Sequence, residues 1–253
     1  MRKLWTHDEM VLTLALYYKL PFGRLVRTTP EVIELANLIG RTNNAVALRL
    51  VNYAACDPVI IESGRTGMAG GVSVCKPVWD EYMEQKERLF FEAEQIKARL
   101  KNSTVEKLLQ INENELLGLD RQAYVKQRVN QQAFRSMILN IYDRSCAITG
   151  INVPDLLVAS HIIPWSESKE ERLNPENGLC LSSLYDKAFD RGYISIDDHY
   201  RVILADKLKQ YHNEPFYGKH FASIEGTEIH LPEYHKPNKL FLEWHRDMVF
   251  DKK

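Results

Sequence analysis

Two aspartates in the second half of the chain have the type and the spacing of ligands for a divalent cation. Asp186 and Asp190 lie four residues apart in a segment, 183–191, that predicts a short helix, so both carboxylates would share one face. Two like charges at that spacing destabilise a bare helix. A divalent cation between them would remove this penalty, because hard cations prefer carboxylate oxygens.

A histidine and an asparagine precede this helix at strand-like segments. His161 ends the short apolar stretch Leu156–His161, which predicts a β-strand, so its ring would project from a rigid element into a loop. Asn177 follows sixteen residues later, before the strand-like stretch 178–181. Taken singly, such a histidine is usually structural, Asn-Gly is a turn signal, and two aspartates are a solvated helix face. The surrounding motifs decide between these readings.

Four motifs surround these residues, and they occur in the order C-x-x-T-G from Cys146, S-H-I-x-P-W from Ser160, R-L-N-P-x-N-G-L-x-L from Arg172 and D-K-A-F-D-R-G from Asp186. Together they resemble the HNH endonuclease family, in the subgroup that lacks zinc-ribbon cysteines and resembles bacterial HNH restriction endonucleases. The resemblance extends over roughly Gly118 to Asp251 and includes an upstream R-V-N-Q-x-x-F-R helix. It implies a ββα-metal domain and cleavage of phosphodiester bonds in DNA.

The resemblance also implies a role for each residue. His161 matches the general base that takes a proton from the attacking water, for which a pKa near ~6.5 is suitable. Asn177 matches the residue that secures the loop and helps to orient His161. Asp186 and Asp190 match positions that would hold one Mg²⁺ or Mn²⁺, and this metal would bind a scissile-phosphate oxygen and the leaving 3′ oxygen.

The chain departs from the family pattern at two positions. The third letter of the motif falls on Asp186 rather than on a histidine, which favours Mg²⁺ over a softer ion. The residue before His161 is an acid or a histidine in many relatives, and here it is Ser160. The metal would therefore have only two protein ligands, with water and phosphate in the remaining positions.

The first 60 residues predict three helices. Thr6 is a plausible cap for the first, Thr29-Pro30 opens the second, which stops at Gly40, and the third follows at once and ends before Asp57-Pro58. Two helices joined by a short turn suggest a helix-turn-helix whose second helix would read DNA, although a small helical bundle without DNA contact would have the same pattern. The exposed DNA-contacting residues would include Arg41, Asn43, Asn44 and Arg49.

Basic residues also occur near the HNH-like motifs. A stripe from Arg121 to Arg144 carries five basic residues and one acid, which suits a phosphate backbone and equally suits a solvated helix face. In this part of the chain the expected phosphate contacts are Arg135, Arg172 and Lys187, with surface solvation as the alternative.

The pattern of elements predicts an α+β chain with a helical domain in front of a nuclease domain. Residues 62–73 contain four glycines and would form a mobile loop or wing, and a long charged helix from Lys76-Pro77 to about Asn102 would be a spacer or a dimerisation helix. The expected domains are residues 1–85 for the helical DNA-binding domain, 86–117 for a helical linker and 118–253 for the nuclease domain.

Composition bounds the remaining possibilities. The net charge of −1 does not by itself indicate a nucleic-acid binder, and the four scattered cysteines form no Cys-x-x-Cys, so neither structural zinc nor a disulfide framework is expected. No apolar run predicts a membrane span or a signal peptide, which favours a cytoplasmic protein. One active centre per chain would require a homodimer, or two successive nicks, for a double-strand break.

Three functions remain in competition. The leading one is a metal-dependent DNA endonuclease, for which restriction in defence against foreign DNA is a candidate role. The alternative is a catalytically inactive DNA-binding protein with an HNH-like domain, which Ser160 favours and the joint presence of His161, Asn177, Asp186 and Asp190 disfavours. A nuclease for RNA is the third, weakly disfavoured because no strand is rich in aromatic residues with basic flanks.

Overall fold

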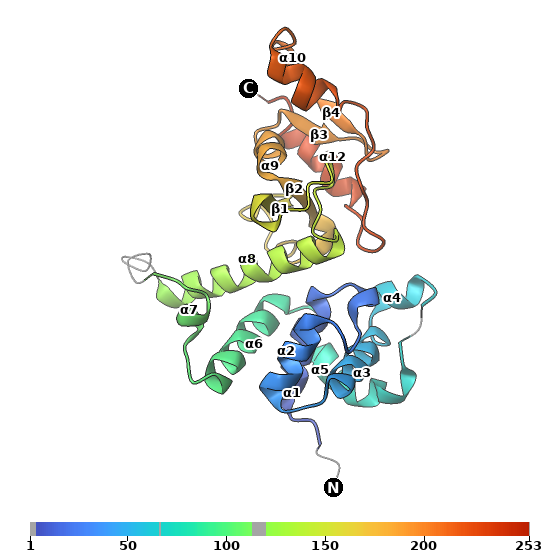
Figure 1. Ribbon diagram of the computed structural model, residues 1–253, viewed down its shortest axis with the longest axis vertical. Helices are drawn as coiled ribbons and strands as arrows, with labels where there is room; N and C mark the ends of the chain where they lie inside the picture. The colour runs from blue at the N-terminus through green and yellow to red at the C-terminus, as the bar shows by residue number, and fades with distance from the viewer. Residues whose placement is uncertain (1–3, 66, 113–119, 253) are drawn as a thin grey trace. The chain divides into compact units, whose positions relative to one another are not determined.

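The computed structural model describes residues 4–65, 67–112 and 120–252, and divides into two compact units (Figure 1). Unit 1, Met1–Ala133, is helical, and unit 2, Phe134–Lys253, combines helices with two small sheets. The predicted α+β class, with a helical part before a part that also contains strands, is confirmed. The expected boundary between residues 117 and 118 lies outside the described residues, and the two units divide farther along the chain, within a helix.

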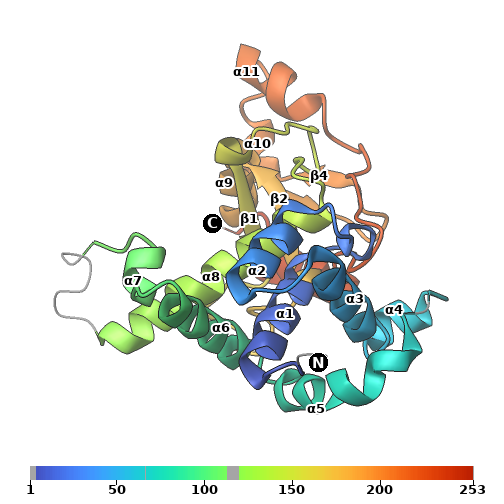
Figure 2. The same cartoon turned by 60° about the horizontal axis from the view of Figure 1, so that its bottom comes forward.

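Unit 1 is built around α1, which contacts four other helices, α2, α3, α5 and α6 (Figure 2). Its helices are α1 (His7–Lys19), α2 (Pro30–Ile39), α3 (Asn43–Ala54), α4 (Pro58–Glu62), α5 (Val72–Tyr82), α6 (Lys86–Leu100) and α7 (Val105–Leu108), with short turns at Phe22–Arg24 and Ala69–Gly71. Helix α8 (Arg121–Ile141) contributes residues to both units. None of the described helices is both long and apolar enough to cross a membrane.

The three predicted N-terminal helices are present, and local chemistry explains their ends. The Thr6 side chain accepts a hydrogen bond from the Glu9 amide while the Glu9 carboxylate accepts one from the Thr6 amide, which is a capping box. Pro30 occupies the first turn of α2, and Gly40, at φ 64°, ends it in the left-handed conformation. Thr42 caps α3 by accepting a hydrogen bond from the Ala45 amide.

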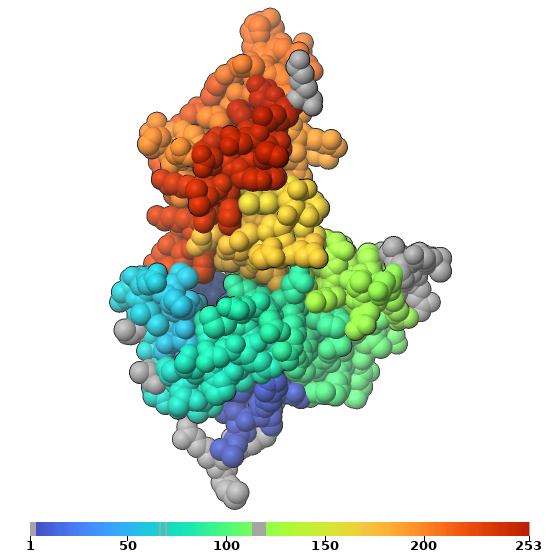
Figure 3. All heavy atoms as spheres, turned by 180° about the vertical axis from the view of Figure 1, so that it is seen from behind, coloured from blue at the N-terminus to red at the C-terminus, as the bar shows by residue number. Residues whose placement is uncertain are grey.

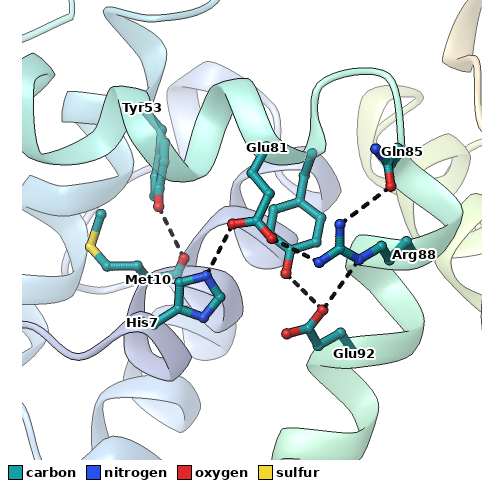
Figure 4. A network of polar contacts seen from close by, with 8 residues as sticks. His7, Met10, Tyr53, Glu81, Gln85, Arg88 and Glu92 are labelled. Atoms are coloured by element: carbon teal, nitrogen blue, oxygen red, sulfur yellow. Dashed lines mark hydrogen bonds and ion pairs between the residues drawn. The ribbon is translucent and has the colours of Figure 1, made fainter.

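The long charged spacer helix was a wrong prediction, because the chain forms two helices there. Pro77 lies inside α5, which ends at Tyr82, and α6 begins at Lys86. The Arg88 side chain donates hydrogen bonds to the side chains of Glu81 and Gln85 across the intervening turn. These contacts belong to a polar network that also includes His7 (Figure 4). Helix α6 packs on α1 through an apolar stripe, the residues Leu89, Phe90, Ala93 and Ile96.

Gly67 and Met68 of the glycine-rich segment lie against α3, where a mobile loop or wing was expected. The Asn52 side chain donates to the Met68 carbonyl, and the Met68 amide donates to the Val51 carbonyl. A Cβ on Gly67 would come within 2.3 Å of the Ala55 backbone nitrogen. Glycine is therefore required by a close backbone approach, and its presence does not mark a mobile loop here.

Unit 2 contains the predicted strands and the predicted short helix. Strand β1 (Leu157–His161) pairs antiparallel with β2 (Gly178–Ser182), and α9 (Ser183–Asp190) follows directly. A second hairpin joins β3 (Ile194–Ile196) to β4 (Val202–Leu204). The helical elements after β4 are α10 (Asp206–Lys209), α11 (Pro215–Tyr217), a π-helical turn at Gly218–Ala222 and α12 (Lys239–Met248).

The β1–β2 hairpin is covered by helices that contact different sides of its strands. Gly178 faces α8 so closely that a Cβ there would lie 2.3 Å from Cδ1 of Ile138, and Gly178 is paired with His161 across the hairpin. Helix α9 contacts both strands. Successive residues of a strand point to opposite faces, so Ser160 and His161 are directed to different sides. The hairpin and α9 together form a ββα unit.

Candidate active site

His161 is held in one orientation at the end of β1. Its Nε2 lies 3.0 Å from the carbonyl oxygen of Arg172, and its ring stacks on Phe134 of α8 with centroids 3.7 Å apart and planes 13° from parallel. Trp165 contacts the same ring edge-on. A carbonyl oxygen can only accept a hydrogen bond, so Nε2 carries the proton and Nδ1 keeps its lone pair. The contacts thus select the tautomer that a general base needs.

The surroundings of His161 keep its imidazole neutral. Burial lowers the pKa of His161 below its usual 6.5, and the positive charge of Arg172 lowers it further, while the hydrogen bond to the Arg172 carbonyl partly opposes both effects. A neutral imidazole is the form that can accept a proton. At pH 7 the ring is therefore ready to act as a base.

Asn177 secures the loop between β1 and β2. Its Oδ1 accepts from the Ile163 amide at 2.8 Å, and its Nδ2 donates to the carbonyls of Ile163 and Glu171 at 3.1 and 3.2 Å. The residue is 1% exposed. Glu171 precedes Arg172, whose carbonyl binds His161. Asn177 therefore helps to position the histidine through the backbone of the loop.

Asp186 and Asp190 lie on α9 as predicted, and the ionised form of each carboxyl is disfavoured. Burial raises the pKa of Asp186, and burial together with the charge of Asp186 raises the pKa of Asp190. The same two effects make the pair receptive to a cation, because a positive ion would favour both ionised carboxylates.

Ser160 supplies a third oxygen beside this pair. It is 2% exposed, and its hydroxyl has no hydrogen-bond partner of ordinary geometry among the described residues. The hydroxyl nevertheless lies near enough to Asp186 to lower the pKa of that carboxyl against the effect of burial. An unpartnered buried hydroxyl beside a carboxylate fits the edge of a site for a hard cation.

The donor set is small but suits magnesium. Within the described ranges, no group of three or more histidine, cysteine, aspartate or glutamate side chains is arranged to hold a metal. Mg²⁺ commonly binds through one or two carboxylates and keeps several waters, whereas structural zinc needs four protein ligands. Two carboxylates and one hydroxyl are therefore compatible with Mg²⁺ or the similar Mn²⁺.

Of the four expected DNA-reading residues of unit 1, only Asn44 is exposed, so the expected exposure of the other three is wrong, while contact of these residues with DNA stays a prediction. Arg41 precedes α3 and forms an ion pair with Glu9 at 2.7 Å, with 11% of its side chain exposed. Arg41 and Arg49 place their guanidinium groups 4.7 and 4.8 Å from the ring centroid of Trp5. Asn44 is exposed and Asn43 is half-buried, so these two remain available on α3.

The expected phosphate contacts of unit 2 have different surroundings. Arg135 donates to the carbonyls of Leu157 and Pro154 at 2.7 and 2.9 Å, so its guanidinium fastens the start of β1. Arg172 donates to the Trp165 carbonyl at 2.9 Å and lies over the Trp165 ring. Lys187 is exposed on α9. Of these three residues, only Lys187 is exposed, and the other two are half-buried.

The basic stripe on α8 is partly neutralised. Arg121 pairs with Glu106 at 2.9 Å, and Lys126 pairs with Glu87 at 3.7 Å. Both acids come from other helices of unit 1, α7 and α6. The sequence stripe therefore overstates the positive charge that this helix presents.

Sequence reasoning missed two side chains that build the site. Phe134 lies in a predicted helix, but nothing in its spacing relates it to His161. His245 is a buried member of α12 and contacts the backbone of α9, whereas its sequence position indicated only an ordinary core or surface histidine. An aromatic residue facing a histidine across the fold leaves no local signal.

Comparison with known families agrees with the geometry. Residues 146–197 match the model of an HNH endonuclease family, a span that includes β1, β2, α9 and β3. A comparison with curated proteins gives no match. HNH nucleases typically use a divalent metal, and a domain of this family indicates nuclease activity. The part of the chain from residue 146 to residue 197 is an HNH endonuclease domain.

Proposed function

We propose that the protein is a metal-dependent DNA endonuclease that hydrolyses phosphodiester bonds with His161 as general base. The observation that carries this proposal is the bond between Nε2 of His161 and the Arg172 carbonyl, which leaves the Nδ1 lone pair for a water molecule. A buried structural histidine would use both ring nitrogens, as His245 does with Ser195 and Phe189. The contrast between the two histidines favours a catalytic role for His161.

The surrounding residues would fix the direction in which His161 accepts its proton. Stacking on Phe134 restricts rotation of the ring, and Asn177 restrains the loop that carries the Arg172 carbonyl. A base held in place before substrate binds loses little entropy when the reaction begins. The neutral imidazole would take the proton of the attacking water.

Asp186, Asp190 and Ser160 would hold Mg²⁺ or Mn²⁺. When bound, the cation would supply positive charge that stabilises the negative charge growing on the phosphate and leaving oxygens. The raised pKa values of the two aspartates support the assignment, because a cation would offset the repulsion between them.

DNA is the proposed substrate, and restriction of foreign DNA in the cytoplasm is the proposed biological setting. Asn43 and Asn44 of α3 and Lys187 of α9 are the proposed contacts, because Asn44 and Lys187 are exposed and Asn43 is half-buried. A homodimer would bring two active centres to the two strands of a duplex, whereas a monomer would nick.

A plasmid assay on the full chain tests the proposal. Supercoiled plasmid is incubated with the purified protein in Mg²⁺, in Mn²⁺ and in chelator, beside a His161→Ala control. Cleavage with either metal that both chelator and His161→Ala abolish supports it. A retarded plasmid band without cleavage in any metal would instead favour an inactive DNA-binding protein, for which the serine at position 160 is the supporting observation. Cleavage of RNA but not of plasmid would reassign the substrate.

A further inference from the structure

Helix α12 lies outside the segment that matches the family model. It nevertheless contacts α9, the helix that carries Asp186 and Asp190. It spans Lys239–Met248, whereas the family match ends at residue 197. Its outer face is exposed at Leu240 and Met248, and the C-terminal segment appears in red on the surface of unit 2 (Figure 3). Its inner face contacts β3.

His245 on the inner face of α12 uses both of its ring nitrogens. Nδ1 lies 2.8 Å from the Ser195 hydroxyl of β3, and Nε2 lies 3.1 Å from the Phe189 carbonyl of α9. The ring stacks on the Phe189 ring with centroids 3.7 Å apart and planes 8° from parallel. Because the carbonyl only accepts, Nε2 is the donor and Nδ1 accepts from Ser195. Burial lowers the pKa of His245 to about 4, so this neutral arrangement persists at pH 7.

The carbonyl that His245 binds belongs to the residue immediately before Asp190. Phe189 is the next-to-last residue of the helix that carries both aspartates, and its carbonyl also accepts from the Gly192 amide at 2.8 Å. The chain just beyond α12 also packs closely against Gly192, which follows α9. A Cβ on Gly192 would lie 2.1 Å from the Val249 carbonyl oxygen. The last turn of α9 is thus fixed from the side of α12.

The other end of α12 reaches the loop that holds His161. Asn238, the N-cap of α12, donates from its backbone to the Glu176 carbonyl at 3.0 Å and from its side chain to the Glu176 carboxylate at 3.3 Å. Glu176 precedes Asn177, which secures the loop. One helix therefore connects the backbone beside Asn177 to the backbone beside Asp190.

We propose that α12 is a positioning element of the nuclease site and that His245 is the residue through which it fixes Asp186 and Asp190 relative to the cation. The inference rests on the proposed function. Ligating carboxylates bind a metal well only when their helix is held within a fraction of an ångström, which the hydrogen bond and the stacked ring provide. His245 touches neither substrate nor metal and acts through the α9 backbone.

Two amide substitutions separate this role from simple core packing. In His245→Gln the longer amide reaches the place of Nε2 and can still donate to Phe189. In His245→Asn the shorter amide reaches only the place of Nδ1 and can still bind Ser195. Both variants lose the stacked ring and should unfold at a lower temperature. Leu208→Ala, which removes a buried side chain of α10 elsewhere in unit 2, is the matched control for lost stability.

The measurement is Mn²⁺ affinity of the full-length protein, from the loss of the free-ion electron paramagnetic resonance signal, with plasmid cleavage against metal concentration beside it. We expect His245→Asn to weaken Mn²⁺ binding about tenfold, in the range found for outer-shell partners of metal ligands. His245→Gln should remain closer to the wild type, and Leu208→Ala should bind Mn²⁺ normally.

The possible failures are distinct. If both His245 variants bind Mn²⁺ as Leu208→Ala does, or if the two are weakened equally, the assignment to His245 is overturned. If the wild-type protein itself binds no Mn²⁺ and cuts no plasmid, the proposed function fails first. If His245→Gln does not fold, His245→Asn still tests the assignment, because it must bind Mn²⁺ more weakly than Leu208→Ala does.

Discussion

The carbonyl oxygen of Arg172 lies 3.0 Å from Nε2 of His161 and fixes which ring nitrogen carries the proton. That carbonyl belongs to the loop that Asn177 ties to Ile163 and Glu171. The backbone of Arg172 therefore binds His161, while its guanidinium group donates to the Trp165 carbonyl and lies over the Trp165 ring. Its side chain was expected to contact phosphate, whereas the contacts that the structure describes for it hold Trp165 in the same loop.

Replacing His161 with alanine should reduce the cleavage rate by at least about 100-fold, the usual contribution of a positioned proton acceptor. DNA affinity should change little, because the ring is engaged with Phe134 and the loop backbone. Rates under single-turnover conditions, with binding measured in Ca²⁺, separate the two effects. Cleavage at the wild-type rate would remove His161 from the mechanism.

The metal-free protein should lose stability as the pH falls from about 6.5 to about 4. His245 has a pKa of about 4 in the folded state against 6.5 as its ordinary value, so the unfolded chain binds a proton that the folded chain refuses. The stabilisation is complete above pH 6.5 and is lost as the pH falls, by about 3 kcal/mol at most. Urea unfolding at several pH values measures this slope. His245→Gln should flatten it, and an unchanged slope would contradict the assignment.

Asp190→Asn should weaken metal binding without harming the metal-free fold. Removing this charge relieves its repulsion with Asp186, so the free energy of unfolding without metal should rise by about 0.5 kcal/mol or stay constant. Added Mg²⁺ should raise the melting temperature of the wild type but not of the variant. Asp206→Asn, at an exposed acid of α10, is the control that should respond to Mg²⁺ as the wild type does.

Ser160→Ala distinguishes a metal-facing hydroxyl from a tolerated packing defect. Its buried hydroxyl lacks an ordinary hydrogen bond, and such a group costs about 1–3 kcal/mol. The variant without metal should therefore be as stable as the wild type or more stable. Its Mg²⁺ requirement should increase, since the site loses an oxygen. An unchanged metal titration would show that the hydroxyl has no part in the site.

The HNH half of the chain was largely predictable because its elements are short and each has a local signal. The apolar stretch ending at His161, the turn before β2 and the glycine after α9 all mark boundaries that the structure has. Fixed motif spacing then placed Asp186 and Asp190 on the predicted helix. These are local features of the chain, and local features can be recognised from the sequence alone.

The errors arose where distant segments meet. From the sequence, Arg41 is expected to be an exposed residue at the start of a helix. In the fold it contacts Glu9 and Trp5, which come from another part of the chain. The charged run before residue 102 conceals an apolar stripe that packs on α1. His245 gains its significance only from Phe189 across the fold. No spacing rule relates such pairs.

The last prediction concerns DNA binding by unit 1. Asn44 is exposed on α3, and an asparagine can make a bidentate contact with adenine, so Asn44→Ala should lower DNA affinity by about 1–3 kcal/mol and leave stability unchanged. Arg41→Ala should instead destabilise the fold by about 3 kcal/mol, because it leaves Glu9 buried without its ion-pair partner.

Both substitutions are best made in a His161→Ala background, where DNA stays intact during the measurement. Fluorescence anisotropy at low salt reports affinity, and thermal unfolding reports stability. If Asn44→Ala binds DNA as its parent does, α3 is not the reading helix. The helices of unit 1 would then be better interpreted as a dimerisation or partner-binding module, because their exposed polar face would have no DNA to contact.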